Sequence, residues 1–264
     1  MKSRYDLIVS LGAACSCTQA LRRAGLQFAS MPLDWVLCGF DRRVDLVCNG
    51  FRDFLNLEDL RSVSLPGWEA RAALDARVEN VRTGMLFLHD FRANIPLAAQ
   101  LPDVAAKYER RISRFYRMVR TSKRVLFVWL MTPLDKPLED VRLVAARDRL
   151  AQCFPSVSVE LLNFELTAGV PLRRCKRRQV SENVSSVGFD YKTYDHPPFP
   201  NSVEEPLLVR YLRWHYAAVD YRTPEQRAEN RRNRNAARYR KYGATGFWNL
   251  QWKRFLGHLG RLFR

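Results

Sequence analysis

Cys15 stands where an apolar run meets a helix-like segment in "DLIVSLGAACSCTQALRRAG", residues 6–25. Backbone amides and the helix dipole stabilise a thiolate at the start of a helix, so a cysteine in this place can act as a nucleophile. The alternative is a packed side chain, because free cysteine is among the most buried residue types. These residues alone leave both roles open for Cys15.

A cysteine nucleophile needs a histidine that takes its proton. Of the four histidines, His89 is the best placed, because it lies near the end of the strand-like run "GMLFLHDF" and strand ends open into clefts. His196 lies in a loop-like stretch, whereas His215 and His258 lie in helix-like segments. The alternative for His89 is a half-buried imidazole that bonds to the backbone or to a neighbouring acid.

Five stretches of the chain resemble a bacterial family of proteins described as papain-like cysteine peptidases. They occur in the order "IVSLGAAC", "LRRAGLQFASMPLDWV", "GFRDFL", "FLHDF" and "YERRISRF", and the resemblance covers roughly residues 5–165. Leu33 stands where the family more usually has phenylalanine before Asp-Trp. The resemblance implies that Cys15 is the nucleophile and His89 the general base, in the Cys-then-His order of papain-like enzymes.

A third group should orient the imidazole in such a site. Asn163 ends the strand-like run "VELLNF" downstream of His89, and we expect it in this role. Asp90 and Asp195 are the alternatives.

The turn before the nucleophile should position the developing oxyanion. We expect Ser10 and Gly12 to shape this turn, and the amides of Ala14 and Cys15 to form an oxyanion hole at the helix start. Other α/β hydrolases also present their nucleophile where a strand runs directly into a turn. The papain-like label therefore describes the catalytic group better than it describes the fold.

Two further motifs could bind substrate. In "SMPLDW", Asp34 could orient the substrate and Trp35 could form an aromatic platform; the alternative is a proline-fixed loop whose tryptophan fills the core. In "KYERRISRFYRMVR", Arg110 and Arg111 could recognise an anionic substrate, because arginine forks match phosphate and carboxylate groups. The alternative there is a solvated helix face.

Strand-like and helix-like segments alternate along the first part of the chain. Apolar runs predict strands over 5–11, 84–91, 125–131 and 158–164, and helical spacing predicts helices over 102–123 and 138–154. The alternation predicts an α/β fold, a single domain with a mixed or largely parallel sheet flanked by helices. Residues 167–205 are expected to be rich in loops.

Composition is consistent with one main domain. The chain has 264 residues, of which 47% are hydrophobic, enough for a substantial core. The six cysteines follow no secretory signal and lack zinc-site spacing, so we expect no disulfide framework, metal or other cofactor. The N-terminus enters a strand directly and no apolar run approaches a membrane span, which favours a cytoplasmic protein.

The net charge of +17 is concentrated at the C-terminus, where residues 222–264 hold 12 Lys or Arg and two Glu. We assign residues 1–221 to the peptidase-like α/β domain and residues 222–264 to a basic linker and an amphipathic helix. This helix is expected to carry an apolar stripe of residues at helical spacing: Trp248, Trp252, Phe255 and Leu259. It predicts contact of residues 247–264 with an anionic membrane surface. Packing onto the domain or a partner is the alternative, and nucleic acid fits a long apolar stripe less well.

Two functions from different classes follow. The first is a papain-like cysteine peptidase, or a related thiol acyl hydrolase or acyltransferase, that forms a thioester at Cys15 on a peptide, acyl or amide substrate. The second is a non-catalytic membrane-surface adaptor associated with envelope polysaccharide assembly, in which Cys15 is structural.

Overall fold

The computed structural model describes residues 1–12, 15–64, 75–132, 135–191, 207–233 and 236. Its contacts divide the chain into two units, Met1–Val219 and Asp220–Arg264.

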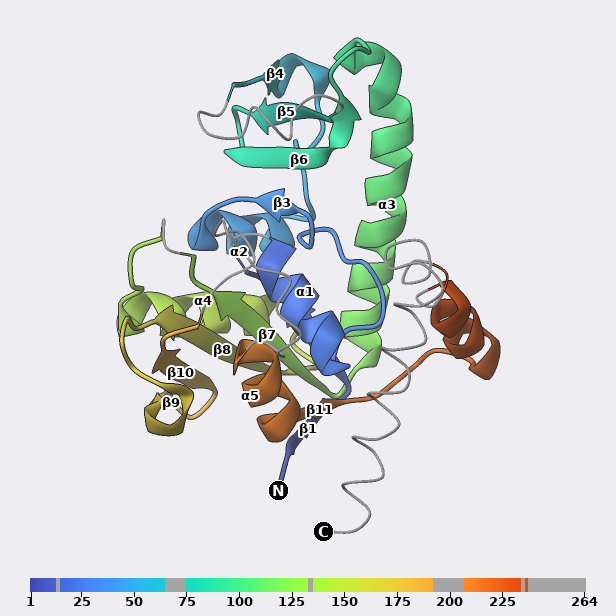
Figure 1. Ribbon diagram of the computed structural model, residues 1–264. Coiled ribbons are helices and arrows are strands. Elements are labelled where there is room, and N and C mark those ends of the chain that lie inside the picture. Colours follow the sequence, from blue (N-terminus) through green and yellow to red (C-terminus); the bar gives the residue numbers. More distant parts are fainter. Residues whose placement is uncertain (13–14, 65–74, 133–134, 192–206, 234–235, 237–264) are drawn as a thin grey trace. The chain divides into compact units, whose positions relative to one another are not determined.

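The first unit is built on a five-stranded sheet with the order β2-β7-β8-β10-β9 (Figure 1). Its strands are β2 (Leu7–Ser10), β7 (Arg124–Leu130), β8 (Ser158–Leu166), β10 (Val184–Phe189) and β9 (Lys176–Ser181). The first four run parallel to one another, and β9 runs antiparallel to β10. The four parallel strands therefore end at one edge of the sheet, where α/β folds place their binding sites.

Helices cover both faces of this sheet: α1 (Cys15–Ala24), α2 (Phe40–Cys48), α3 (Leu97–Thr121), α4 (Asp140–Cys153) and α5 (Leu207–His215). Successive side chains of a strand point to opposite faces. Leu7 and Val9 accordingly belong to one core cluster with residues of α2, α3 and α4, whereas Ile8 belongs to a second cluster with residues of α1 and α5. The predicted α/β fold with a largely parallel sheet is confirmed.

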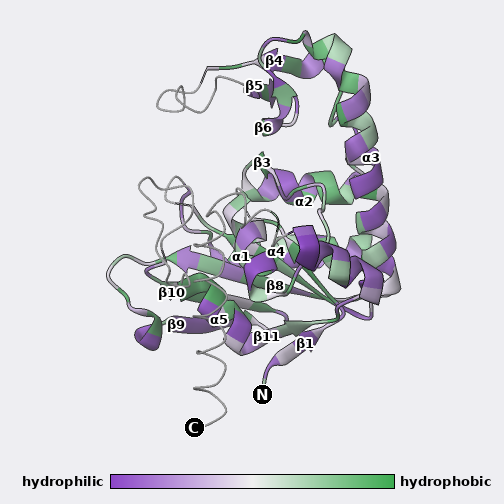
Figure 2. Ribbon diagram, turned by 45° about the vertical axis from the view of Figure 1, so that its right-hand side comes forward, coloured by the Kyte–Doolittle hydropathy of each residue, from purple (hydrophilic) through white to green (hydrophobic). Residues whose placement is uncertain are grey.

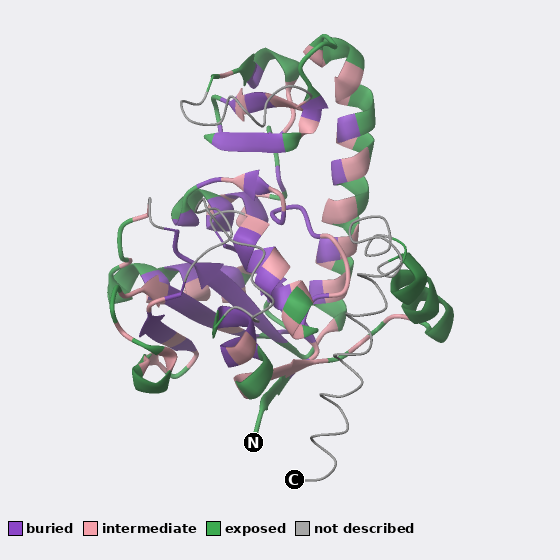
Figure 3. Cartoon of the chain, viewed as in Figure 1, coloured by how far each residue is buried: buried purple, intermediate pink, exposed green. Residues whose placement is uncertain are grey.

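A second sheet is antiparallel and has the order β3-β6-β5-β4. Its strands are β3 (Val36–Leu37), β6 (Met85–Arg92), β5 (Asp75–Asn80) and β4 (Leu60–Ser62), the last preceded by a 3-10 turn over Leu57–Asp59. Helix α3 joins the two sheets, because Tyr108 packs on Phe87 of β6 and Phe115 packs on Phe127 of β7. Hydrophobic and hydrophilic residues mix along α3, with one buried side (Figures 2 and 3).

A short parallel pair completes the first unit. β1 (Ser3–Tyr5) pairs with β11 (Tyr216–Ala218), which directly follows α5. A 3-10 turn over Leu172–Arg174 precedes β9.

Two predictions about elements were wrong in detail. Helix α3 begins at Leu97 rather than at residue 102. The side-chain amide of Gln100 fixes this earlier start, because its Oε1 accepts a hydrogen bond from the Arg92 amide and its Nε2 donates to the carbonyl of Ile95. The stretch expected to be rich in loops contains β9 and β10. The charged sequence "KRRQVS" of β9 lacks an apolar alternation, because β9 is an exposed edge strand.

The second unit is described at residues 220–233 and 236, and residues 224–233 are helical. Thr223 and Gln226 form a capping box at its start: the Gln226 amide donates to Thr223 Oγ1 (3.2 Å), and the Thr223 amide donates to Gln226 Oε1 (3.0 Å). Among the described residues, no helix is both long and apolar enough to span a bilayer. The predicted membrane-contact residues Trp248, Trp252, Phe255 and Leu259 lie outside the described residues.

Candidate active site

Strand β2 leads the chain to Cys15 at the carboxyl edge of the central sheet. All four residues of β2 are buried, and the next backbone amide, that of Leu11, still donates to the carbonyl of Val128 in β7 (2.7 Å). The chain then turns at Gly12, whose amide donates to Ser10 Oγ (3.3 Å). Helix α1 begins at Cys15, which is half-buried. Of the two predicted turn-shaping residues, Ser10 thus ends β2 and Gly12 lies between β2 and α1.

Cys17, the second cysteine of the C-x-C pair, is an internal residue. Its side chain is 2% exposed, and its Sγ lies 3.5 Å from the carbonyl oxygen of Val128, to which it donates. Burial raises the pKa of this thiol to about 12. A Cβ atom at Gly12 would lie 2.2 Å from Cys17 Cβ, so only glycine lets the first turn of α1 pack this close to the strand end. Cys15 is therefore the more accessible thiol of the pair.

The start of α1 is electrostatically suited to an anion. No acidic residue occupies the first turn of the helix, so no carboxylate there opposes the positive end of the helix dipole. Ala14, whose amide is predicted to line an oxyanion hole, lies outside the described residues.

The segment with the sequence "SMPLDW" is folded around the carboxylate of Asp34, which is fully buried. This carboxylate accepts hydrogen bonds from Thr18 Oγ1 of α1 (2.9 Å), Gln27 Nε2 (2.8 Å) and the Met31 amide (2.8 Å). Burial raises the pKa of Asp34. With these partners Asp34 fastens α1 to the following loop, which favours the structural alternative over direct contact with substrate.

Arg43 of α2 also holds this segment in place. It is fully buried, and its guanidinium donates to the carbonyls of Leu33 (2.9 Å), Val36 (2.5 Å) and Cys38 (3.0 Å). The sequence does not single out Arg43, because an arginine in a helix ordinarily lies on a solvated face. Its closeness in sequence to the buried Val44 and Val47 was the available signal.

Trp35 is half-buried, and it does not fill the core. The guanidinium carbon of Arg22 in α1 lies 5.4 Å from the centre of its ring, a cation–π contact. An aromatic surface is thus available beside α1.

His89 lies in a bulge of β6. Ala76 pairs with Phe91 and Val78 pairs with Phe87, so three residues of β6 face one residue of β5. Bulges redirect side chains, and the side chain of His89 is 48% exposed. Its Nδ1 atom lies 3.7 Å from Oδ2 of Asp75, the first residue of β5.

Asp75, the carboxylate beside His89, was not among the residues predicted from the sequence. Its other oxygen lies 3.7 Å from Nη1 of Arg92, so this carboxylate is shared by His89 and Arg92. Its approach to His89 depends on the pairing of β5 with β6. The segment that contains β5 carried no clear strand pattern in the sequence.

The residues predicted to orient His89 have other partners. Asp90 accepts hydrogen bonds from Lys107 Nζ (2.5 Å) and Tyr108 OH (2.8 Å), which bind β6 to α3. Asn163 is buried in β8 of the central sheet, and its Nδ2 donates to Glu165 Oε1 (3.1 Å) and Ser186 Oγ (3.0 Å). Asp195 lies outside the described residues. The orienting role of Asn163 stays a prediction, and the carboxylate that the structure brings to His89 is that of Asp75.

One short segment connects the elements that carry Cys15 and His89. Asp34 binds Thr18, one turn after Cys15 in α1. Two residues after Asp34, Val36 pairs with Phe87 in β6, two residues before His89. A displacement of this segment would therefore move the thiol and the imidazole relative to each other.

The arginines of α3 differ in their exposure to solvent. Arg110 is exposed. The guanidinium of Arg111 lies 5.2 Å from the ring centre of Tyr108, and its Nη1 is buried without a hydrogen-bond partner in the described part of the chain. Arg114 Nη1 donates to the carbonyl of Ser30 (2.9 Å).

Comparison with known proteins identifies the family of the chain. A family model described as "Putative papain-like cysteine peptidase (DUF1796)" matches residues 6–160, a range that includes Cys15, Asp75 and His89. An uncharacterized protein of Acanthamoeba polyphaga mimivirus is 27% identical over 138 residues, 48% of this chain and 62% of the viral protein. The chain thus matches less than two thirds of that relative's length, and no solved structure matches significantly. Because the family model covers more than half of the chain, the protein belongs to the DUF1796 family that this model describes.

Proposed function

We propose that the protein is a cysteine-nucleophile hydrolase of peptidase type, with Cys15 as the nucleophile and His89 as the general base. The observation that carries this proposal is the family match, whose range includes both residues. The position of Cys15 at a helix start supports it, because that position stabilises a thiolate. The carboxylate beside the His89 imidazole supports the assignment of the base.

In the proposed reaction, His89 takes the proton of the Cys15 thiol and the sulfur attacks the carbonyl carbon of an amide or ester. The bond from that carbon to nitrogen or oxygen breaks, and the leaving amine or alcohol takes the proton from the imidazolium. Water then attacks the thioester carbon while His89 accepts its proton. The acid leaves, the carbon–sulfur bond breaks and the sulfur regains its proton. An acyltransferase would replace this water by another acceptor.

Asp75 is the proposed orienting residue of the imidazole. A carboxylate at Nδ1 favours the tautomer that carries its proton there, which leaves Nε2 free to act as the base. It also stabilises the imidazolium that forms when the thiol loses its proton. Asp75 lies within the range of the family match, whereas Asn163 lies beyond it.

Arg111 and Arg110 are proposed to favour acidic substrates. Arg110 is exposed and Arg111 is half-buried on α3. An acidic group on the substrate could accept a charge-assisted hydrogen bond from an arginine fork at this position.

The release of p-nitrophenolate from p-nitrophenyl acetate tests the covalent step. We expect a burst of about one product per protein molecule, because deacylation of a thioester is commonly slower than its formation. Cys15→Ser should abolish the burst, whereas Cys175→Ser, at a cysteine of the same intermediate exposure, should leave it unchanged. A wild-type protein without a burst, or a Cys15→Ser protein with an undiminished burst, would reject the proposal. The first outcome would instead support the adaptor hypothesis.

A further inference from the structure

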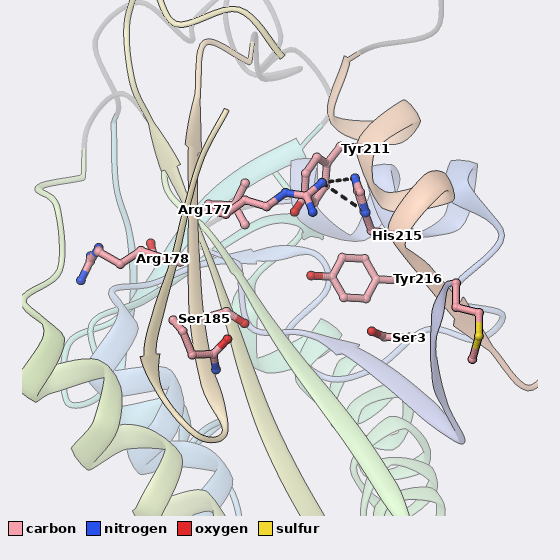
Figure 4. A pocket seen from close by; sticks show the side chains of 11 residues that line it. Ser3, Arg177, Arg178, Ser185, Tyr211, His215 and Tyr216 are labelled. Atoms are coloured by element: carbon pink, nitrogen blue, oxygen red, sulfur yellow. Dashed lines mark hydrogen bonds between the residues drawn. The ribbon is translucent and has the colours of Figure 1, made fainter. Parts of the chain in front are cut away.

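A pocket of about 450 Å³ lies beside β9, the edge strand of the central sheet (Figure 4). One wall comes from β9 and β10, and the other from β1, α5 and β11. Neither Cys15 nor His89 is among the eleven residues that line it. Its volume lies in the range of small-molecule sites.

The lining is polar and carries positive charge. It contains Arg177, Arg178 and His215 together with several hydroxyl groups, among them those of Ser185 and Tyr216. None of the described lining residues is acidic. The composition therefore selects an anionic ligand that also carries hydrogen-bonding groups.

Arg177 is the principal candidate for binding the anion. Figure 4 shows its side chain pointing from β9 toward α5, where its Nη2 contacts both Nε2 and Nδ1 of the His215 imidazole. Its guanidinium carbon lies 5.1 Å from the ring centre of Tyr211. Burial and the charge of Arg177 lower the pKa of His215. No carboxylate pairs with Arg177 in the described part of the chain, which leaves its charge uncompensated.

Arg178, the next residue, is the natural comparison. Side chains alternate along a strand, and Arg178 points away from His215 (Figure 4). It pairs with Asp140 of α4 and with Glu165 of β8, the latter at 3.2 Å. The charge of Arg178 is thus balanced by two carboxylates, whereas the charge of Arg177 is not.

The segment around the pocket adds to the positive field. Five of the six residues 173–178 are basic. Arg173, Arg174 and Lys176 are exposed, and no ion pair joins them to other residues that the structure describes. Several cations around one uncompensated arginine favour a dianion over a monoanion, because each additional charge on the ligand is attracted by all of them.

We infer that this pocket binds a phosphorylated small molecule, with the phosphate on Arg177 and the organic part among the hydroxyl groups of the lining. The guanidinium fork matches phosphate oxygens. The cavity leaves room beyond the phosphate for an organic group, and the hydroxyl groups of Ser185 and Tyr216 can bind that group through hydrogen bonds.

Phosphorus NMR of inorganic phosphate and of phenyl phosphate, each titrated with the full chain at constant ionic strength, tests this inference. We expect line broadening with wild type, tighter binding of phenyl phosphate than of phosphate, and no displacement by equimolar acetate. Arg177→Gln should weaken binding about tenfold or more, because it removes charge-assisted hydrogen bonds. Arg178→Gln removes the same charge from the neighbouring residue and should change binding less than about twofold, since its carboxylate partners already neutralise it.

Three outcomes would overturn the inference: equal weakening by the two variants, displacement by acetate, or absence of broadening with wild type. Arg177→Lys keeps the charge without the fork and should bind with intermediate strength, which separates recognition by the fork from general attraction. Cys15→Ser should bind phosphate like wild type. A failure of the proposed hydrolase would therefore leave this result unaffected.

Discussion

The Gly12→Ala substitution tests the close packing between the end of β2 and the start of α1. The added Cβ would lie 2.2 Å from Cys17 Cβ and 3.0 Å from its Sγ, whereas ordinary contacts begin at 3.4 Å. The Cys17 Cβ moves only with its backbone, so α1 must shift by about 1 Å. The Leu11 amide donates to the carbonyl of Val128 (2.7 Å) and so keeps the end of β2 in place. The strain can therefore not be relieved by a movement of β2.

Overpacking of this kind costs about 1–3 kcal/mol, and we expect a value near the upper end. For a domain of this size, that corresponds to a fall in Tm of about 5–10 °C. Because Cys15 begins the displaced helix, the p-nitrophenyl acetate burst should also fall. Urea unfolding followed by circular dichroism measures the first effect, and the burst assay measures the second.

Gly39→Ala is the matched control. A Cβ at Gly39 meets no atom within 4 Å, and its φ of −68° suits any residue. It caps α2, so the substitution should cost less than about 1 kcal/mol and leave the burst unchanged. If Gly12→Ala were as stable and as reactive as Gly39→Ala, the packing account of the helix start would be refuted.

Further predictions concern the groups around the site. Asp34→Ala should lower the free energy of unfolding in urea by at least about 2 kcal/mol, because Thr18 and two other donors lose their acceptor in the interior; an effect below 0.5 kcal/mol, within the usual range for surface substitutions, would contradict the anchoring role. The folded pKa of Cys17 is raised from 9.0 to about 12, so the unfolded chain loses this proton first, and stability should decline as pH rises from about 9 toward 12. Cys17→Ser should show a smaller decline than wild type, because Cys48 and Tyr116, whose pKa values burial also raises to about 12, still contribute. An unchanged pH profile would contradict the contribution of Cys17. Asp75→Asn should slow thioester formation about tenfold or more, whereas Asp41→Asn, in an exposed ion pair, should not; equal rates would remove Asp75 from the site.

The central sheet could be predicted where its strands are buried on both faces. β7 has a continuous apolar run for that reason, and its helical neighbours have clear periodicity. β9 could not be predicted, because an edge strand with "KRRQVS" has no buried face to impose a pattern. For the same reason, no local sequence motif indicates that Arg177 lines a pocket.

The candidate site was predictable where it depends on local order along the chain. Cys15 follows a strand directly, and the order of strand, turn and helix can be read from the sequence. Asp75 depends on an antiparallel pairing with a bulge, and Arg43 depends on a loop that folds back over α2. Asn163 precedes the end of β8, an internal strand whose neighbour β10 supplies Ser186 as its partner. Residues brought together by tertiary contacts of this kind leave no mark on local spacing.

The alkylation rate of Cys15 by iodoacetamide against pH, read by peptide mass spectrometry, tests the Cys15–His89 assignment most directly. We predict an apparent pKa well below the roughly 8.5 of a free cysteine, and a rise toward that value in His89→Ala. His215→Ala, at a histidine of the phosphate pocket, should leave the profile unchanged. An unreactive Cys15, or a profile that does not respond to His89→Ala, would contradict the assignment.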